Sequence, residues 1–248
     1  MEKSSILELI RAKQSAGKKM VALLIDPDRT NGEKLDNIID RCKVFAPDII
    51  LVGGSLVSVD VTTIYNHLKS QLSIPLVAFP GGINQISYLA DGLLFLSLIS
   101  GRNPELLIGN HVVAAPVLKK SGIEVISTGY ILVDGGVVTS VQYMSNTTPV
   151  PSNKIDIASA TAIAGEFLGM KLIYLEAGSG ALNPVSPVMI KNVKSAISVP
   201  LIVGGGINTP EKLTLAFEAG ADIVVIGTAI EKDVDLLQGF ITALEFYR

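Results

Sequence analysis

The stretch PLIVGGGINTPEKLTLAFEAGADIVVIGT, residues 200–228, decides the fold of this chain. It begins with a short apolar run that ends in three glycines, and it closes with a second apolar run that ends in Gly-Thr. Between these runs, Thr209 and Pro210 form a typical helix start, because threonine caps the first turn and proline fits the first helical position. The pattern therefore predicts a strand, a helix and a second strand, with a glycine-rich turn after the first strand and a Gly-Thr turn after the second.

The same alternation of apolar runs and helical segments extends through the whole chain. Eight runs predict strands, and they read as continuous apolar segments, as parallel strands covered on both faces do. Eight such strands within 248 residues favour one α/β domain over residues 1–248, a (β/α)8 TIM barrel rather than a doubly wound open sheet. The predicted strands are 20–26, 49–54, 74–81, 92–99, 124–133, 172–178, 200–207 and 223–228, and the predicted helices include 35–45, 59–72, 104–120, 155–168 and 210–219.

Two connections depart from the regular barrel pattern. The third and fourth predicted strands are separated by INQISYLAD, residues 83–91, which is shorter than the roughly ten to twelve residues that a crossover with its helix needs. We therefore expect the third helix to be missing or reduced to a turn, which would open a gap in the outer ring. After the fifth strand, residues 134–153 form a long polar segment that we interpret as a loop able to cover the barrel mouth.

The amino-acid composition excludes or disfavours several classes of function. Lys and Arg total 20 against 23 Asp and Glu, and this net charge of -3 does not favour binding to nucleic acid. The single cysteine, Cys42, excludes a disulfide framework and a cysteine-based zinc site, and it fits a cytoplasmic protein. The densest apolar run, residues 93–99, is far shorter than the ~18 residues of a membrane helix. A peripheral contact with a membrane stays open.

Acidic and hydroxyl side chains follow the first two predicted strands. In a TIM barrel the chemistry lies at the carboxyl ends of the strands. Asp26 comes directly after the first strand, in LLIDPDR, and an acid at this place suits a hard cation such as Mg²⁺. Asp28 is explained equally well as a turn residue. Ser55 follows two glycines after the second strand and offers a hydroxyl, which alone is a weak signal.

The last three predicted strands carry the strongest signals. The glycines after strands seven and eight predict a phosphate site, because exposed backbone amides and a helix amino terminus attract an anion. Glu176 ends an apolar strand, where burial of a carboxylate costs several kcal/mol, as an order of magnitude, unless the group is paired or functional. We expect Glu176 to accept a proton or hold a hydroxyl. Tyr174 lies on the same face of the strand, where it either reaches the ligand or fills the barrel interior.

Together these segments resemble the geranylgeranylglyceryl phosphate synthase family. The matching segments LLIDPDR, ILVGGS, SGRNPELLIGNHV, YLEAGSGA, VGGGI and IGTAI occur in order over nearly the whole chain. The resemblance implies a modified TIM barrel without its third helix. It implies a transferase of ether phospholipid synthesis, which joins the 3-hydroxyl of sn-glycerol 1-phosphate to C1 of a long prenyl diphosphate, with geranylgeranyl diphosphate as the expected donor.

The resemblance also assigns roles to individual residues. It implies Mg²⁺ as the cofactor on Asp26 and Ser55, and Glu176 as the catalytic acid that holds the glycerol hydroxyls. Where the other main branch of the family has a lysine, this chain has Leu24, so no phosphate contact is expected from that position. The implied glycerol phosphate pocket consists of Tyr174, Leu175, Glu176, Ala177, Gly178, Ser179, Gly180, Gly205, Gly206, Gly227 and Thr228.

Two other interpretations share part of this pattern. An isomerase or lyase of a sugar phosphate would have the glycine loops, but it would not explain an acid after strand one together with a missing helix. A non-enzymatic barrel that binds a phosphorylated ligand would not need both Asp26 and Glu176. Barrels of this kind commonly form dimers or larger assemblies, so we expect a homo-oligomer.

Overall fold

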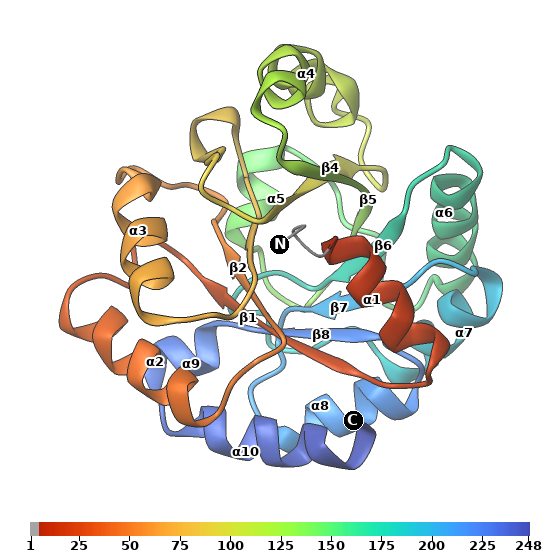
Figure 1. Ribbon diagram of the computed structural model, residues 1–248. Coiled ribbons are helices and arrows are strands. Elements are labelled where there is room, and N and C mark those ends of the chain that lie inside the picture. The colour runs from red at the N-terminus through yellow and green to blue at the C-terminus, as the bar shows by residue number, and fades with distance from the viewer. Residues whose placement is uncertain (1–4) are drawn as a thin grey trace.

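The computed structural model describes residues 5–248, and its centre is a closed barrel of eight parallel strands (Figure 1). Each strand pairs with the next along the chain, and β1 closes the barrel by pairing with β8. The predicted TIM barrel and all eight predicted strands are confirmed. The strands are β1 (Met20–Ile25), β2 (Ile49–Val52), β3 (Leu76–Ala78), β4 (Gly92–Leu98), β5 (Glu124–Leu132), β6 (Leu172–Glu176), β7 (Leu201–Gly204) and β8 (Ile223–Ile226).

Helices surround the barrel and begin close to where the sequence predicts them. Thr209 caps α8 as expected, because its hydroxyl accepts a hydrogen bond from the Lys212 amide at 3.4 Å. The helices are α1 (Ile6–Ser15), α2 (Glu33–Val44), α3 (Val61–Gln71), α4 (Asn110–Ser121), α5 (Ser140–Ser145), α6 (Ile155–Phe167), α7 (Pro187–Ala196), α8 (Pro210–Glu218), α9 (Thr228–Lys232) and α10 (Leu236–Leu244), with a π-turn at η2 (Glu105–Gly109) and short 3₁₀ turns at η1 (Ile83–Gln85) and η3 (Glu245–Tyr247).

The connection between β3 and β4 contains no α-helix, as predicted. Its place is taken by the short turn η1, which ends at the buried Gln85. The Gln85 side chain accepts hydrogen bonds from the amides of Gly54 and Gly81 at 3.2 and 3.1 Å, and it donates to the Gly54 carbonyl at 2.8 Å. One side chain thus fixes the loops after β2 and β3 to each other at the carboxyl end of the barrel.

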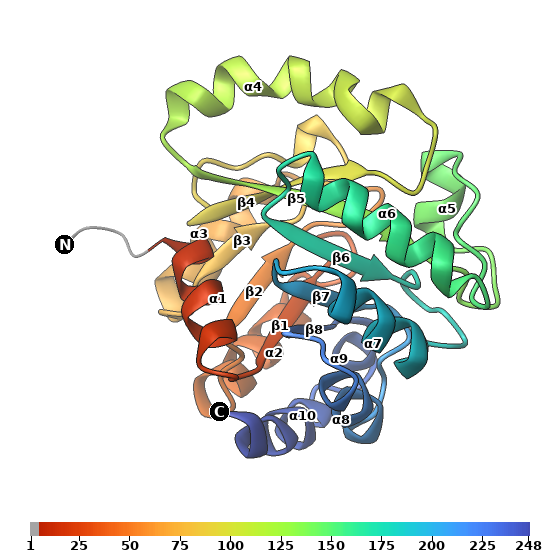
Figure 2. The same ribbon diagram turned by 90° about the vertical axis from the view of Figure 1, so that its right-hand side faces the viewer.

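The segment 134–153 is more ordered than the expected loop. It contains the short helix α5, and Val150 forms an isolated bridge with Val133 at the end of β5. The predicted loop thus contains a short helix, and α5 stands at the mouth of the barrel, as expected of a segment that covers it (Figure 2).

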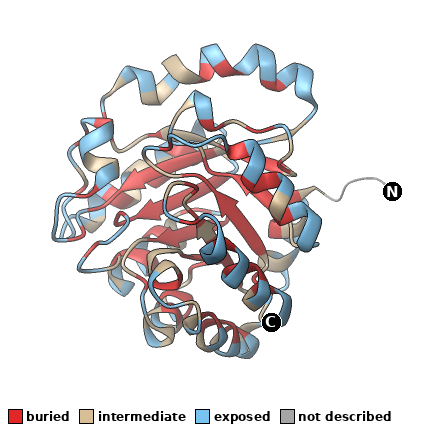
Figure 3. Ribbon diagram, turned by 90° about the vertical axis from the view of Figure 1, so that its left-hand side faces the viewer, coloured by how far each residue is buried: buried red, intermediate tan, exposed pale blue. Residues whose placement is uncertain are grey.

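Two layers of apolar side chains hold the barrel together. One fills the barrel interior, and the other lies between the strands and the outer helices, so the strands are buried on both faces (Figure 3). At the amino-terminal end, Ile6 and Ile10 of α1 join the interior layer, and Glu124 accepts hydrogen bonds from the amides of Ile6 and Leu7. Because α1 closes this end, the opposite end is left for a ligand (Figure 2).

Other predicted features have structural roles. Cys42 is buried in α2, and burial raises the pKa of its thiol to about 12, so the group is inert at neutral pH. His111 is buried in α4, where Nε2 lies 3.0 Å from the Ser97 hydroxyl and the ring packs edge-on against Phe95. His67 pairs with Asp36 on the surface. Within residues 5–248, every helix falls short of the length and apolar character needed to cross a membrane.

Candidate active site

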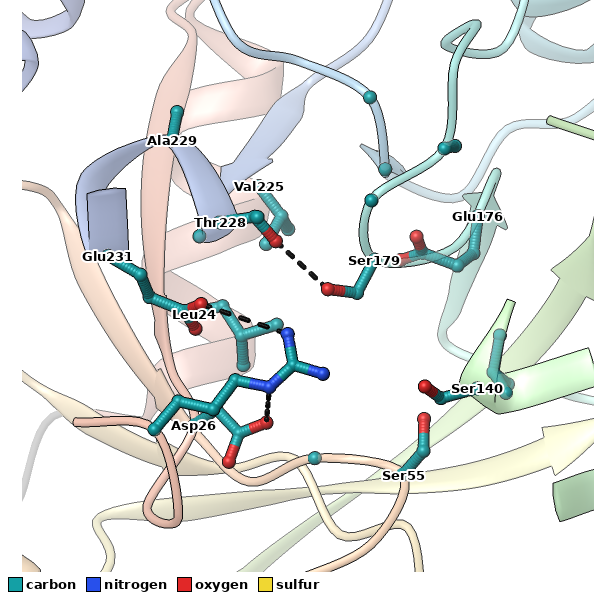
Figure 4. A pocket seen from close by; sticks show the side chains of 18 of the residues that line it. Leu24, Asp26, Ser55, Ser140, Glu176, Ser179, Val225, Thr228, Ala229 and Glu231 are labelled. Carbon is teal, nitrogen blue, oxygen red and sulfur yellow. Dashed lines mark hydrogen bonds and ion pairs between the residues drawn. The ribbon is translucent and has the colours of Figure 1, made fainter. Parts of the chain in front are cut away.

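A cavity of about 640 Å³ opens at the carboxyl ends of the strands (Figure 4). The loops after β1, β2, β6, β7 and β8 line it together with α5, so residues far apart in the sequence meet there. Most of the predicted site residues are among them. The predicted residues that line the cavity are Asp26, Ser55, Glu176, Ser179, Gly180, Gly205, Gly206, Gly227 and Thr228.

Four predicted residues do not line the cavity. Tyr174 is fully buried below the cavity, and Gly178 is also buried. Leu175 and Ala177 point outward into the layer between the barrel and the helices. Strand alternation explains the outward direction of Leu175 and Ala177, since the odd-numbered neighbours of Glu176 face away from the barrel axis.

Glu176 is a buried carboxylate at the last position of β6, with 6% of its surface exposed. Its Oε1 accepts a hydrogen bond from the Gly178 amide at 2.7 Å. Burial raises its pKa from 4.5 to about 7, while the nearby Tyr174 hydroxyl and the Gly178 amide act in the opposite direction. A carboxyl group with a pKa near neutral pH exchanges protons readily, which suits a general base.

Glycine residues of β7 make room for this carboxylate. A Cβ on Gly205 would lie 2.5 Å from Glu176 Oε1, and Gly205 has a φ of +84°, which side chains rarely tolerate. A Cβ on Gly204 would collide with both the Tyr174 hydroxyl and Glu176 Oε2. The glycines after strand seven therefore serve Glu176 as well as the expected anion.

Three aromatic rings pack together below Glu176: Phe79 and Tyr130 line the cavity floor, and Tyr174 is buried beneath them. The ring centroids of Tyr130 and Tyr174 are 5.1 Å apart, and those of Phe79 and Tyr174 are 5.6 Å apart. The Tyr174 hydroxyl lies close to Glu176 and lowers the pKa of that carboxyl, which acts against the effect of burial. This apolar floor explains why Glu176 is strongly desolvated although it borders an open cavity.

The loops after β6 and β8 meet above this floor. The hydroxyls of Ser179 and Thr228 lie 2.9 Å apart, which brings Gly180 and Gly227 to the same wall (Figure 4). Gly206 adopts a φ of +69°, and a Cβ there would lie 2.8 Å from the Pro184 nitrogen. This wall exposes backbone groups and two hydroxyls. Backbone amides and hydroxyls are the donors that commonly bind a phosphate group.

Asp26 occupies the opposite wall (Figure 4). Its side chain is 17% exposed, and burial raises its pKa, although the Arg29 guanidinium and the Asp28 amide counteract this. The carboxylate packs against Gly54, where a Cβ would lie 3.0 Å from Oδ2, and so it lies next to the loop that carries Ser55. Asp28 instead accepts hydrogen bonds from the Ser58 and Val59 amides, which makes it a turn residue.

Asp26 and Ser55 are the oxygen-bearing side chains of this wall that could hold a Mg²⁺ ion. Within the described residues, no group of three or more His, Cys, Asp or Glu side chains could hold a metal. Asp26 and Ser55 would therefore act with water and ligand oxygens. Magnesium is commonly bound in this way, through one or two carboxylates and substrate phosphates.

Three charged residues of the cavity, Arg29, Glu231 and Lys232, were not predicted from the sequence. Arg29 and Glu231 both line the cavity, and they form an ion pair with 3.9 Å between Nη1 and Oε2. Arg29 also pairs with Asp26 at 3.5 Å. Arg29 is the last residue of the LLIDPDR motif, and Glu231 and Lys232 directly follow IGTAI.

Comparisons with known proteins support the resemblance drawn from the motifs. The model of the PcrB family matches residues 14–244. The chain is 52% identical over 233 residues to geranylgeranylglyceryl phosphate synthase of Chitinophaga pinensis, covering 91% of this chain and 90% of that protein. It is 41% identical to the Pyrococcus abyssi protein of the same name, over 91% and 90% of the two chains.

A solved structure agrees with both the sequence and the fold. The crystal structure of (S)-3-O-geranylgeranylglyceryl phosphate synthase from Thermoplasma acidophilum, in complex with its substrate sn-glycerol-1-phosphate, superposes with a TM-score of 0.90 at 31% identity. The alignment covers 98% of each chain. The resemblance inferred from the sequence is thereby confirmed.

Proposed function

The chain belongs to the PcrB family, and from this premise we propose how its cavity carries out prenyl transfer. The protein is a prenyltransferase that joins the 3-hydroxyl of sn-glycerol 1-phosphate to a prenyl diphosphate, with geranylgeranyl diphosphate as the proposed donor. The observation that carries the proposal is the buried Glu176, whose pKa is raised to about 7, between a glycine-lined wall and the acid Asp26. A carboxylate base beside a phosphate site would also suit a sugar-phosphate isomerase, so the similarity to named synthases favours prenyl transfer over the alternatives.

The glycerol phosphate is assigned to the wall formed by the loops after β6, β7 and β8. Gly205, Gly206 and Gly227 let the backbone approach the phosphate, and the Ser179 and Thr228 hydroxyls supply further donors. The glycerol hydroxyls then face Glu176. Tyr174 acts from below on this carboxylate, whose pKa it lowers, and the Gly178 amide donates a hydrogen bond to it. The Ala177 amide donates to the Gly204 carbonyl, and the Leu175 side chain lies in the outer layer, so these two residues support the strand rather than the ligand.

Glu176 orients the 3-hydroxyl and accepts its proton as the new bond forms. The hydroxyl oxygen forms a bond to C1 of the prenyl group, the bond from C1 to the diphosphate oxygen breaks, and the electron pair leaves with the diphosphate. Asp26 and Ser55 would hold Mg²⁺ beside that leaving group. When bound, the ion neutralises charge on the diphosphate.

The prenyl chain is assigned to the apolar part of the cavity. Leu56, Phe79, Val141 and Leu182 line it, from the loops after β2, β3 and β6 and from α5. Of these, Leu56 and Phe79 follow β2 and β3, the strands that precede the connection without a helix. Apolar contacts of this kind stabilise a hydrocarbon chain roughly in proportion to the area removed from water, at about 25 cal/mol per Å².

The proposed function is tested by product analysis. The protein is incubated with geranylgeranyl diphosphate and either sn-glycerol 1-phosphate or sn-glycerol 3-phosphate, with Mg²⁺ or with a chelator. We expect prenylglyceryl phosphate only from the first enantiomer and only with Mg²⁺. Equal use of both enantiomers would refute the placement of Glu176, and full activity in chelator would refute the metal site.

We also propose a cytoplasmic homo-oligomer that contacts membranes peripherally to release its lipid product. Exposed apolar side chains on α4, such as Val112, Val113 and Val117, support assembly, and the exposed Leu56 and Leu182 at the cavity rim support membrane contact. Light scattering that gives the monomer mass would refute the first proposal. Failure to sediment with lipid vesicles when product is present would refute the second.

A further inference from the structure

Arg29 is a cation of the cavity to which the reaction described above gives no role. It lies in the loop after β1, and 49% of its side chain is exposed. Nε is 3.5 Å from Asp26 Oδ2, and Nη1 is 3.9 Å from Glu231 Oε2. The dashed lines that end on Asp26 and Glu231 in Figure 4 mark these two ion pairs. Both distances exceed 3.2 Å, so charge attraction rather than short hydrogen bonds holds the guanidinium.

The acidic lining of the cavity makes Arg29 important for binding an anionic substrate. Among the described side chains that line the cavity, four are acids, and two are basic, Arg29 and Lys232. A prenyl diphosphate carries several negative charges and enters a cavity that is itself acidic. It therefore needs a cation from the protein beside any bound metal ion. A guanidinium suits this purpose, because its donors match two phosphate oxygens at once.

We propose that Arg29 is a diphosphate-binding residue and that it exchanges partners when the substrate arrives. Without substrate it bridges Asp26 and Glu231. When the diphosphate and its cation enter, the guanidinium leaves Asp26 for the diphosphate oxygens, and Glu231 continues to hold it from the other side. The inference rests on the proposed function, since it takes the diphosphate to be the leaving group beside Asp26.

The exchange keeps every charge paired. Asp26 loses the guanidinium and gains the cation, so its half-buried carboxylate is never left without a counter-charge. The pair that must break, between Arg29 and Asp26, is long and partly exposed, so little stabilisation is lost. As the C1–oxygen bond breaks, the electron pair moves onto the diphosphate, and a guanidinium already in contact with it stabilises that developing charge.

Direct binding measurements on three variants test the inference. The variants are Arg29→Gln, Arg29→Lys and the matched control Lys232→Gln. Calorimetric titration with inorganic diphosphate in the presence of Mg²⁺ measures the affinity for the leaving group. Electron paramagnetic resonance with Mn²⁺ alone measures the affinity for the cation. We expect Arg29→Gln to weaken diphosphate binding about 10- to 100-fold, as loss of a hydrogen bond to a charged group does. We expect it to bind Mn²⁺ as tightly as the wild type or more tightly, because a competing cation is gone.

The other variants and the kinetics sharpen the test. Arg29→Lys should recover part of the diphosphate affinity, and Lys232→Gln should have a smaller effect than Arg29→Gln. The KM for the prenyl diphosphate should rise in Arg29→Gln while the KM for sn-glycerol 1-phosphate stays unchanged. Unchanged diphosphate affinity in Arg29→Gln, weaker Mn²⁺ binding, or a larger effect of Lys232→Gln would each overturn the inference. If the wild type binds diphosphate through Arg29 but transfers no prenyl group, the proposed function fails and the inference stands.

Discussion

Glu176 and Asp26 are both acids at strand ends of the same cavity, yet their surroundings differ. Glu176 lies above three aromatic rings, and its carboxylate accepts a hydrogen bond from the Gly178 amide. Asp26 is partly exposed and pairs with Arg29. Burial raises the pKa of both groups, and it raises that of Glu176 to about 7.

The comparison shows that the surroundings of two similar carboxylates can give them different chemical roles. The aromatic floor favours the neutral form of Glu176, so this group takes up a proton near neutral pH. Burial also raises the pKa of Asp26, but the Asp28 amide and the Arg29 guanidinium act against burial and favour the charged form that a cation needs. Two carboxylates with different surroundings can thus divide the roles of base and metal ligand between them.

The largest effect is expected on the Glu176 side. Glu176→Gln keeps the shape of the side chain but removes the base, and loss of a general base lowers the rate about 10²- to 10⁴-fold. Steady-state kinetics should show this fall in kcat with a modest change in the affinity for sn-glycerol 1-phosphate. Circular dichroism serves as the folding control. Near-normal turnover in a folded variant would remove Glu176 from the mechanism.

On the other wall, Asp26→Asn should lower turnover by removing the charge that holds the cation. A metal ion at a leaving group contributes several kcal/mol, so the expected fall is about 10²- to 10³-fold. Binding of sn-glycerol 1-phosphate, measured by calorimetry without the second substrate, should stay nearly unchanged. If that binding were lost instead, the two walls would have been assigned the wrong way round.

Glu176 should also reduce the stability of the fold at high pH. Its pKa is about 7 in the folded protein and 4.5 as the reference value, so the carboxyl group is protonated in both states at low pH. Stability is lost as the pH rises from 4.5 through 7, and by pH 8 the loss is about 3 kcal/mol. Glu176→Gln stays neutral, so in denaturant titrations it should be more stable than the wild type at pH 8 but not at pH 4. Equal stability of the two proteins at pH 8 would argue against a strongly raised pKa.

Much of this arrangement was predictable because the signals were local. Continuous apolar runs located the strands, a short connection revealed the missing helix, and Glu176 stood out as an acid at the end of an apolar run. Glycines marked the loops after β7 and β8. Each of these signals depends on a few neighbouring residues, and the barrel brings their positions together at one end.

The features that were missed depend on contacts between distant segments. Arg29 and Glu231 pair because β1 lies beside β8 in the closed barrel, and no local pattern shows that contact. The helix α5 has only six residues and no side-chain cap, so its sequence signal is weak. The depth of Tyr174 below the cavity depends on how the rings of Phe79 and Tyr130 stack over it.

The smallest effect is expected at the phosphate wall, where Ser179 is exposed and its hydroxyl lies 2.9 Å from that of Thr228. Ser179→Asp places a carboxylate beside the proposed phosphate, and Ser179→Asn is the neutral control of nearly the same size. Like charges repel, but water screens an exposed pair, so we expect the KM for sn-glycerol 1-phosphate to rise only about tenfold. The asparagine variant should change it much less, and the KM for the prenyl diphosphate should stay constant in both. A rise confined to the prenyl diphosphate would move the glycerol phosphate to the Asp26 wall. An equal rise in both variants would indicate that Ser179 acts through its hydroxyl rather than through the charge of the site.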